Sequence, residues 1–68
     1  MTKIDSAKVQ ALMLERGVGV LELAALAKIP AKTISALHRR DVKVYIPTLT
    51  RLARALQVDP MTLVKAVA

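Results

Sequence analysis

Basic side chains are concentrated in the middle of the chain. Between residues 28 and 54 the one acidic residue is Asp41, and the seven cationic residues are Lys28, Lys32, Arg39, Arg40, Lys43, Arg51 and Arg54. This segment carries a charge of 7 − 1 = +6, which equals the formal net charge of all 68 residues. A run of charge is often only a solvated surface, but segregation this complete favours a surface that binds nucleic acid.

Residues with catalytic potential are few. Ser35, His38 and Asp41 have the residue types of a hydrolase triad, but they follow one another at intervals of three along one short segment. A chain of this size offers no pocket for an oxyanion site beside them. The sequence has one histidine and no cysteine, which argues against metal and thiol chemistry. We therefore expect no enzyme, no cofactor, no metal site and no small-molecule ligand.

The length and composition limit the architecture. With 68 residues the chain can form one small domain, spanning 1–68. Apolar residues make up 54% of it, and Tyr45 is the one aromatic residue, so the core must be aliphatic, which suits packed helices. The longest mostly apolar stretch, 18–27, contains Glu22 and is too short to span a membrane. The lack of cysteine fits a cytoplasmic protein.

Helical periodicity predicts an all-α fold, a compact bundle of five short helices. The first three are expected at 6–16, which Asp5 or Ser6 begins and Gly17 ends, at 20–28, and at 31–40 after Pro30. The fourth begins at Pro47 and Thr48 and ends near 56. The fifth follows Asp59 and Pro60. Residues 42–46 alternate like a strand, but with no partner strand in view they are interpreted as a loop.

The segment 31–40 differs from the other helices. Its apolar stripe consists of Ile34 and Leu37, and the rest of its circumference has small or cationic side chains. A helix that is anchored along one narrow stripe leaves most of its surface free to contact something else. The short link between 20–28 and 31–40 is typical of a helix-turn-helix.

The stretch from Gly17 to Ser35 resembles the phage-repressor and Cro-like, or XRE-type, helix-turn-helix family. The matching residues are Leu23-Ala24, Ile29 and Thr33-Ile34-Ser35, and further along Pro47, Leu52-Ala53, Leu56, Val58 and Leu63. The resemblance covers nearly the whole chain, from about 12 to 64. No single motif is specific, but the combined spacing is distinctive. It implies a lambda-repressor-like DNA-binding domain, bacterial or phage-encoded.

The resemblance also implies roles for individual residues. The helix 31–40 would enter the major groove, with base contacts from Ala31, Lys32, Thr33, Ser35 and Ala36. Phosphate contacts would come from Val20, through its backbone N–H, and from Arg39, Arg40 and Lys43. We expect Arg51 and Arg54 to be solvated instead.

The sequence departs from the family in three places. The loop between His38 and Pro47 is about three residues longer than usual, which makes 42–46 a candidate strand across a dimer. Val20 stands where the family often has a glutamine that holds a phosphate. Lys28 stands where the family commonly has a glycine in a left-handed turn, which predicts strain of about 1 kcal/mol.

The expected function is sequence-specific binding of double-stranded DNA by a dimeric transcriptional regulator, a repressor. Small domains of this kind usually bind as dimers, and the candidate interface residues are Val44, Tyr45, Ile46, Leu63 and Val67. The alternative is a protein-interaction module or antitoxin that binds an acidic protein with the same fold.

Overall fold

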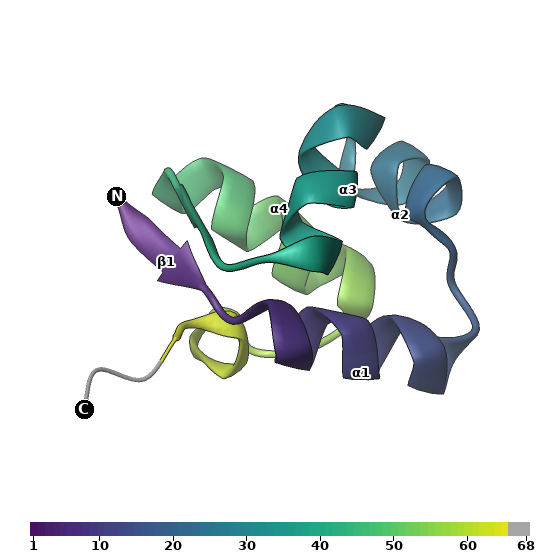
Figure 1. Cartoon of the computed structure of the whole chain (residues 1–68), viewed down its shortest axis with the longest axis horizontal. Coiled ribbons are helices and arrows are strands. Elements are labelled where there is room, and N and C mark those ends of the chain that lie inside the picture. The colour runs from purple at the N-terminus through teal and green to yellow at the C-terminus, as the bar shows by residue number, and fades with distance from the viewer. Residues whose placement is uncertain (66–68) are drawn as a thin grey trace.

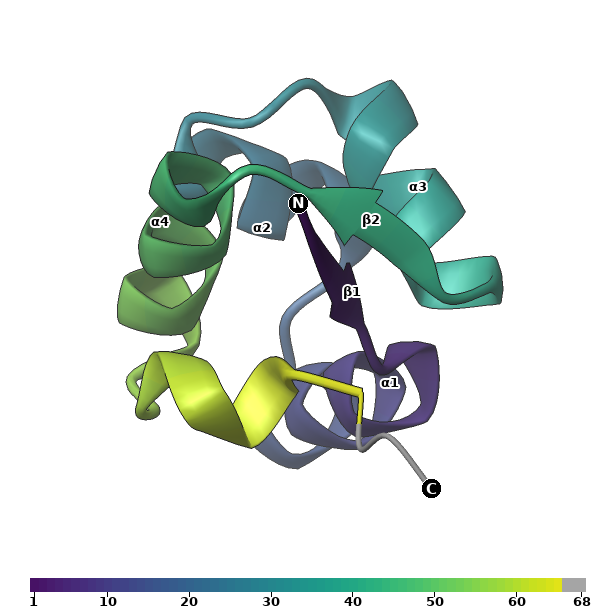
Figure 2. The same ribbon diagram turned by 90° about the vertical axis from the view of Figure 1, so that its left-hand side faces the viewer.

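Four α-helices, a two-stranded ribbon and one 3₁₀ turn make up the part of the protein that the computed structural model describes, residues 1–65. Figures 1 and 2 show the helices around a common core with the ribbon across one end. In chain order the elements are β1 (Thr2–Ile4), α1 (Ser6–Arg16), α2 (Val20–Ala27), α3 (Ala31–Arg39), β2 (Val42–Val44), α4 (Ile46–Leu56) and the 3₁₀ helix η1 (Pro60–Leu63).

The helix α1 has the predicted bounds because both of its ends are strongly signalled. The Asp5 carboxylate accepts the backbone N–H groups of Ala7 at 3.1 Å and Lys8 at 3.4 Å. Gly17 ends the helix in the left-handed conformation, at φ +66°, which costs a residue without Cβ little. The prediction for 6–16 is confirmed.

In each of the next three helices, one boundary differs from the prediction by one residue. The helix α2 stops at Ala27 because Lys28 takes the left-handed conformation, φ 57° and ψ 44°. The helix α3 stops at Arg39 because Arg40 is extended. The helix α4 begins at Ile46, one residue before the predicted start, and Tyr45 is its N-cap residue.

The predicted helical bundle is confirmed for its first four helices, but residues 42–44 form a strand where the sequence predicts a loop. The strand β2 pairs antiparallel with β1, in the register Thr2↔Val44, Lys3↔Lys43 and Ile4↔Val42. Its partner is thus the first segment of the same chain. Ile4 and Val44 are buried, so the ribbon is held because its inner side chains join the core.

The fifth predicted helix is one 3₁₀ turn. Asp59 begins it as expected, and its carboxylate accepts the Met61 N–H at 2.8 Å. The turn ends after Leu63 because Val64 is extended and forms an antiparallel bridge with Ile4. Val67 lies outside the described residues.

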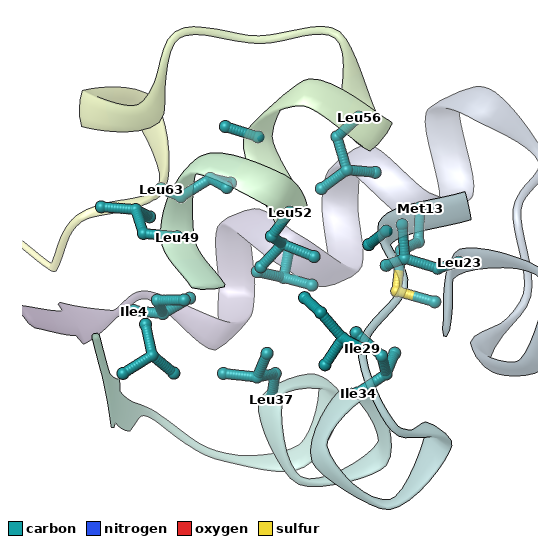
Figure 3. Close-up of a cluster of buried hydrophobic side chains, with 14 residues drawn as sticks. Ile4, Met13, Leu23, Ile29, Ile34, Leu37, Leu49, Leu52, Leu56 and Leu63 are labelled. Carbon is teal, nitrogen blue, oxygen red and sulfur yellow. The ribbon is translucent and has the colours of Figure 1, made fainter. Parts of the chain in front are cut away.

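The core draws side chains from every element (Figure 3). The fully buried large ones are Ile4, Val9, Leu23, Ile34, Leu37, Leu52, Leu56 and Leu63. Two of them, Ile34 and Leu37, belong to α3, and they attach this helix to the bundle. In the described part of the chain, every helix is too short or too polar to span a lipid bilayer.

Candidate nucleic-acid interface

A tight turn joins α2 to α3. Lys28 turns the chain in the left-handed conformation, and the Ile29 N–H donates to the Ala24 carbonyl at 3.1 Å. The Ile29 side chain is buried and fixes the turn on the core. Ala24, half-buried, packs against the same core from α2. Together these residues hold α2 and α3 as one rigid helix-turn-helix.

Among residues 1–65, no other element covers the outer face of α3. In Figure 1, α3 lies in front of α2 and α4, and in Figure 2 it lies at the right-hand edge of the molecule. Lys32 and Arg39 are exposed, and Ala31, Thr33, Ser35 and Ala36 are half-buried. All five residues predicted to contact bases thus have accessible surface on one helix.

The far end of α3 is tied to α1. The Gln10 side-chain amide donates to the His38 carbonyl, and His38 itself is half-buried. The orientation of α3 is therefore set at its start by the turn, along its length by Ile34 and Leu37, and at its end by α1.

The helices α2 and α3 begin without a side-chain cap. Gly19 precedes α2 and Pro30 precedes α3, and neither provides a side-chain acceptor. The first intrahelical bonds run from Leu23 to Gly19 and from Thr33 to Pro30, so the N–H groups before them are free of helical partners. Such donors at a helix N-terminus can bind a phosphate oxygen, and those of α2 include Val20, where the sequence predicts a phosphate contact.

The cations of the basic segment have no acidic partner in the structure. Within residues 1–65 the one ion pair is Lys65–Asp41, with Nζ and Oδ2 3.3 Å apart. Arg39, Arg40 and Lys43, the predicted phosphate contacts, are exposed and unpaired there. Unpaired cations beside an uncovered helix can bind an external polyanion.

The ribbon adds a cation that sequence reasoning missed. Lys3 lies directly opposite Lys43 in the β1–β2 register, and both side chains are exposed. Like charges directly opposite each other destabilise a strand pair, so an anion bound between them would relieve the repulsion. The signal in the sequence was the alternation of Thr2, Lys3 and Ile4 before the capping residue Asp5.

Asp41, the acid in the basic segment, has a structural role. Its Oδ1 accepts the Ser6 N–H at 2.9 Å, and its Oδ2 lies next to Lys65. The hydrogen bond from the Ser6 backbone, with a smaller contribution from Lys65, lowers the pKa of Asp41 below its ordinary value. This carboxylate joins the start of α1 to the start of β2.

The candidate dimer residues divide into two groups. Val44 and Leu63 are core residues, so their side chains are not available to a second molecule. Tyr45 and Ile46 are 68% and 59% exposed. Met1 is 71% exposed and precedes Thr2, the partner of Val44, so it lies at the same end of the ribbon.

Comparison with known families places the chain in one of them. Residues 8–68 match the model of the Cro/C1-type HTH DNA-binding domain. The chain belongs to this family, which confirms the resemblance seen in the sequence and identifies a DNA-binding domain.

Similar domains occur in solved structures of longer chains. A variant of hydroxyethylphosphonate dioxygenase matches at TM-score 0.82, and native PhpD with cadmium atoms matches at TM-score 0.80. Both are 28% identical, and each match covers 96% of this chain but 14% of the other. No curated protein sequence was found to match.

Proposed function

We propose that this domain binds a specific double-stranded DNA sequence as a dimer and acts as a repressor, with α3 in the major groove. The observation that carries the proposal is the outer face of α3, which is cationic and which the described part of the chain leaves uncovered and without ion pairs. Membership in the Cro/C1-type family supports it.

Base recognition is assigned to the first turns of α3. Lys32 can donate to the O6 and N7 atoms of guanine, and the Thr33 and Ser35 hydroxyls can bond to several bases. Ala31 and Ala36 are small enough for close approach and can contact a thymine methyl group. Lys32 has the most exposed side chain of these five, so it is the principal candidate for sequence discrimination.

Phosphate contacts are assigned to both sides of α3. The free N–H groups at the start of α2, including that of Val20, would bind one phosphate. Arg39, Arg40 and Lys43 would bind phosphates beyond the other end, and Lys3 joins them because the ribbon sets it opposite Lys43. These contacts give affinity and register without reading sequence.

Dimerisation is assigned to the end of the ribbon. Tyr45 and Ile46 follow Val44, and Met1 precedes its partner Thr2, so these three exposed side chains lie at the same end of the ribbon. The edge of β2 itself is a poor partner for a second β2, because Lys43 would meet its own copy there. A dimer would place two copies of α3 in successive major grooves, about 34 Å apart.

We assign no catalytic step to this domain, although its relatives of known structure include a dioxygenase. In the described residues the Asp41 carboxylate contacts Ser6 and Lys65. It is therefore not available as the acid of a triad with Ser35 and His38. This supports a regulator rather than an enzyme.

The test is selection of bound duplexes from a random pool, followed by a titration of the selected duplex at several salt concentrations. A palindromic consensus is expected, and its affinity should fall with salt at a slope of about −0.9 per phosphate contacted. Failure to enrich any sequence would refute specific recognition. Salt-independent binding to an acidic protein, with no duplex binding, would favour the alternative of a protein-interaction module or antitoxin.

A further inference from the structure

A groove of about 620 Å³ lies between the C-terminal end of α2 and the second half of α4. Leu26 and Lys28 line it on one side, and Arg51, Arg54, Ala55 and Gln57 line it on the other. Figure 2 shows α4 at the opposite edge of the molecule from α3. DNA bound along α3 would therefore leave the outer surface of α4 open.

The charge of this groove is positive. Lys28, Arg51 and Arg54 are exposed, no acidic residue lines it, and none of the three forms an ion pair within residues 1–65. The C-terminal ends of α2 and α4 also meet here, and each adds a partial charge of about −0.5. Three cations against these two helix ends leave a surplus of about +2, so the groove attracts an anion.

The groove also has an apolar part. Leu26 is 58% exposed, and Ala55 is half-buried. A phosphate backbone would pair with the cations but would leave this apolar surface uncovered. A peptide with carboxylates on either side of an aliphatic side chain matches both parts, because Arg51 and Arg54 are three residues apart on one face of α4.

We infer that this groove binds an acidic peptide segment of a partner protein while α3 remains free to bind DNA. The guanidinium groups of Arg51 and Arg54 bind carboxylates, each of them able to form paired hydrogen bonds. Lys28 binds a further carboxylate from across the groove, and an aliphatic side chain of the segment packs on Leu26 and Ala55. Arg51 and Arg54, which the sequence predicts to be only solvated, thus belong to a binding site.

The first measurement locates the bound peptide. The probe is a short synthetic peptide of glutamate, leucine and serine, and the control peptide has glutamine in place of each glutamate. Amide NMR shifts of the labelled protein should change at Leu26, Lys28, Arg54 and Gln57, and not along α3. The control peptide should cause no comparable shifts. Shifts along α3, shifts caused equally by both peptides, or no shifts at all would overturn the inference.

The second measurement separates the two surfaces with matched variants. The double variant R51Q/R54Q and its control R39Q/R40Q each remove two positive charges from exposed positions, and circular dichroism checks that both remain folded. R51Q/R54Q should lower peptide affinity about tenfold and leave affinity for duplex DNA close to that of the parent protein. R39Q/R40Q should leave peptide affinity unchanged. If R51Q/R54Q instead weakens duplex binding as strongly as R39Q/R40Q does, the groove contacts DNA and the inference is refuted.

Discussion

The helices of this domain begin in two different ways. The carboxylates of Asp5 and Asp59 cap α1 and η1, and they accept backbone N–H groups from the first turn. Gly19 and Pro30 precede α2 and α3 without any side-chain cap. The first turns of α1 and η1 thus have backbone donors satisfied by a carboxylate of the protein. The two helices of the motif leave theirs open to a phosphate, and α4 also begins without a side-chain cap, after Tyr45.

The distribution of charge also divides the chain into two parts. Outside residues 28–54, Lys3, Lys8, Arg16 and Lys65 balance Asp5, Glu15, Glu22 and Asp59. Inside that segment, Asp41 is turned to a structural contact with Ser6 and Lys65. We therefore expect stability and DNA binding to depend mainly on separate sets of residues, and substitutions can test this separation.

The largest effect is expected for a residue that attaches α3 to the core. Ile34→Ala should lower the free energy of unfolding by about 2–5 kcal/mol, because the side chain is fully buried and its removal leaves a cavity. Denaturant unfolding followed by circular dichroism measures this. Lys32→Ala, two residues earlier on the exposed face, is the control and should change stability by less than about 0.5 kcal/mol. Equal losses would contradict the division between the two faces of α3.

The next effect concerns recognition. Lys32→Ala should reduce discrimination between the selected duplex and a scrambled one by about 1–3 kcal/mol, because a base contact is lost. Arg39→Ala should weaken both duplexes alike and reduce the salt slope by about 1. Fluorescence anisotropy titrations over a salt series measure both quantities. Equal, small effects of the two variants on every duplex would refute the assignment of α3 as the reading helix.

A smaller effect is expected at the turn between α2 and α3. Lys28 has φ 57° and Gln57 has φ 59°, a conformation that strains residues with a Cβ. Lys28→Gly should raise the free energy of unfolding by about 0.5–1 kcal/mol, after allowance for the greater flexibility of the unfolded chain. Gln57→Gly, which relieves the same strain outside the motif, should stabilise to a similar degree in thermal unfolding. A loss of stability in both variants would show that neither position is strained.

A still smaller change in stability tests the open helix ends directly. Gly19→Asp would place a capping carboxylate at α2, and a side chain there meets no other atom within 4 Å. Because glycine is already a fair N-cap, the gain in stability should be a few tenths of a kcal/mol. DNA affinity should fall, since the carboxylate would occupy the free donors and repel the phosphate. Gly19→Asn provides the same cap without charge. If both variants bind the duplex like the parent in a titration, α2 does not contact the DNA.

Much of the helical architecture could be predicted because its signals are local. The bounds of α1 follow from the two residues that flank it. Asp5 begins the helix by accepting backbone hydrogen bonds, and Gly17 ends it by its left-handed conformation. The ribbon could not be predicted in this way, since three residues carry too little periodicity and the partner strand lies some forty positions away. The pairing of β1 with β2 depends on the packing of Ile4 in the core. Ile4 also forms a bridge with Val64, and this bridge ends η1.

The same distinction between local and long-range signals applies to the candidate site. The exposure of Lys32 and the burial of Ile34 follow from helical periodicity and agree with the structure. The sequence predicts Val44 and Leu63 as dimer contacts, whereas the structure buries both, because an apolar residue looks the same in sequence whether it faces the core or a partner. Lys3 was missed because its place opposite Lys43 depends on the long-range strand pairing.

The smallest effect concerns Asp41, whose contacts are equally long-range. Its pKa is lowered in the folded protein, first by the Ser6 N–H, so its ionisation stabilises the fold above the ordinary pKa of 3.8. This contribution is lost as the pH falls through the lowered value. Asp41→Asn keeps an oxygen acceptor for Ser6 but has no charge to titrate. The parent should therefore be the more stable protein at neutral pH, and its melting temperature should fall more steeply in acid until the difference disappears. Melting curves that stay parallel from neutral pH into acid would mean that this carboxylate does not join the start of α1 to β2.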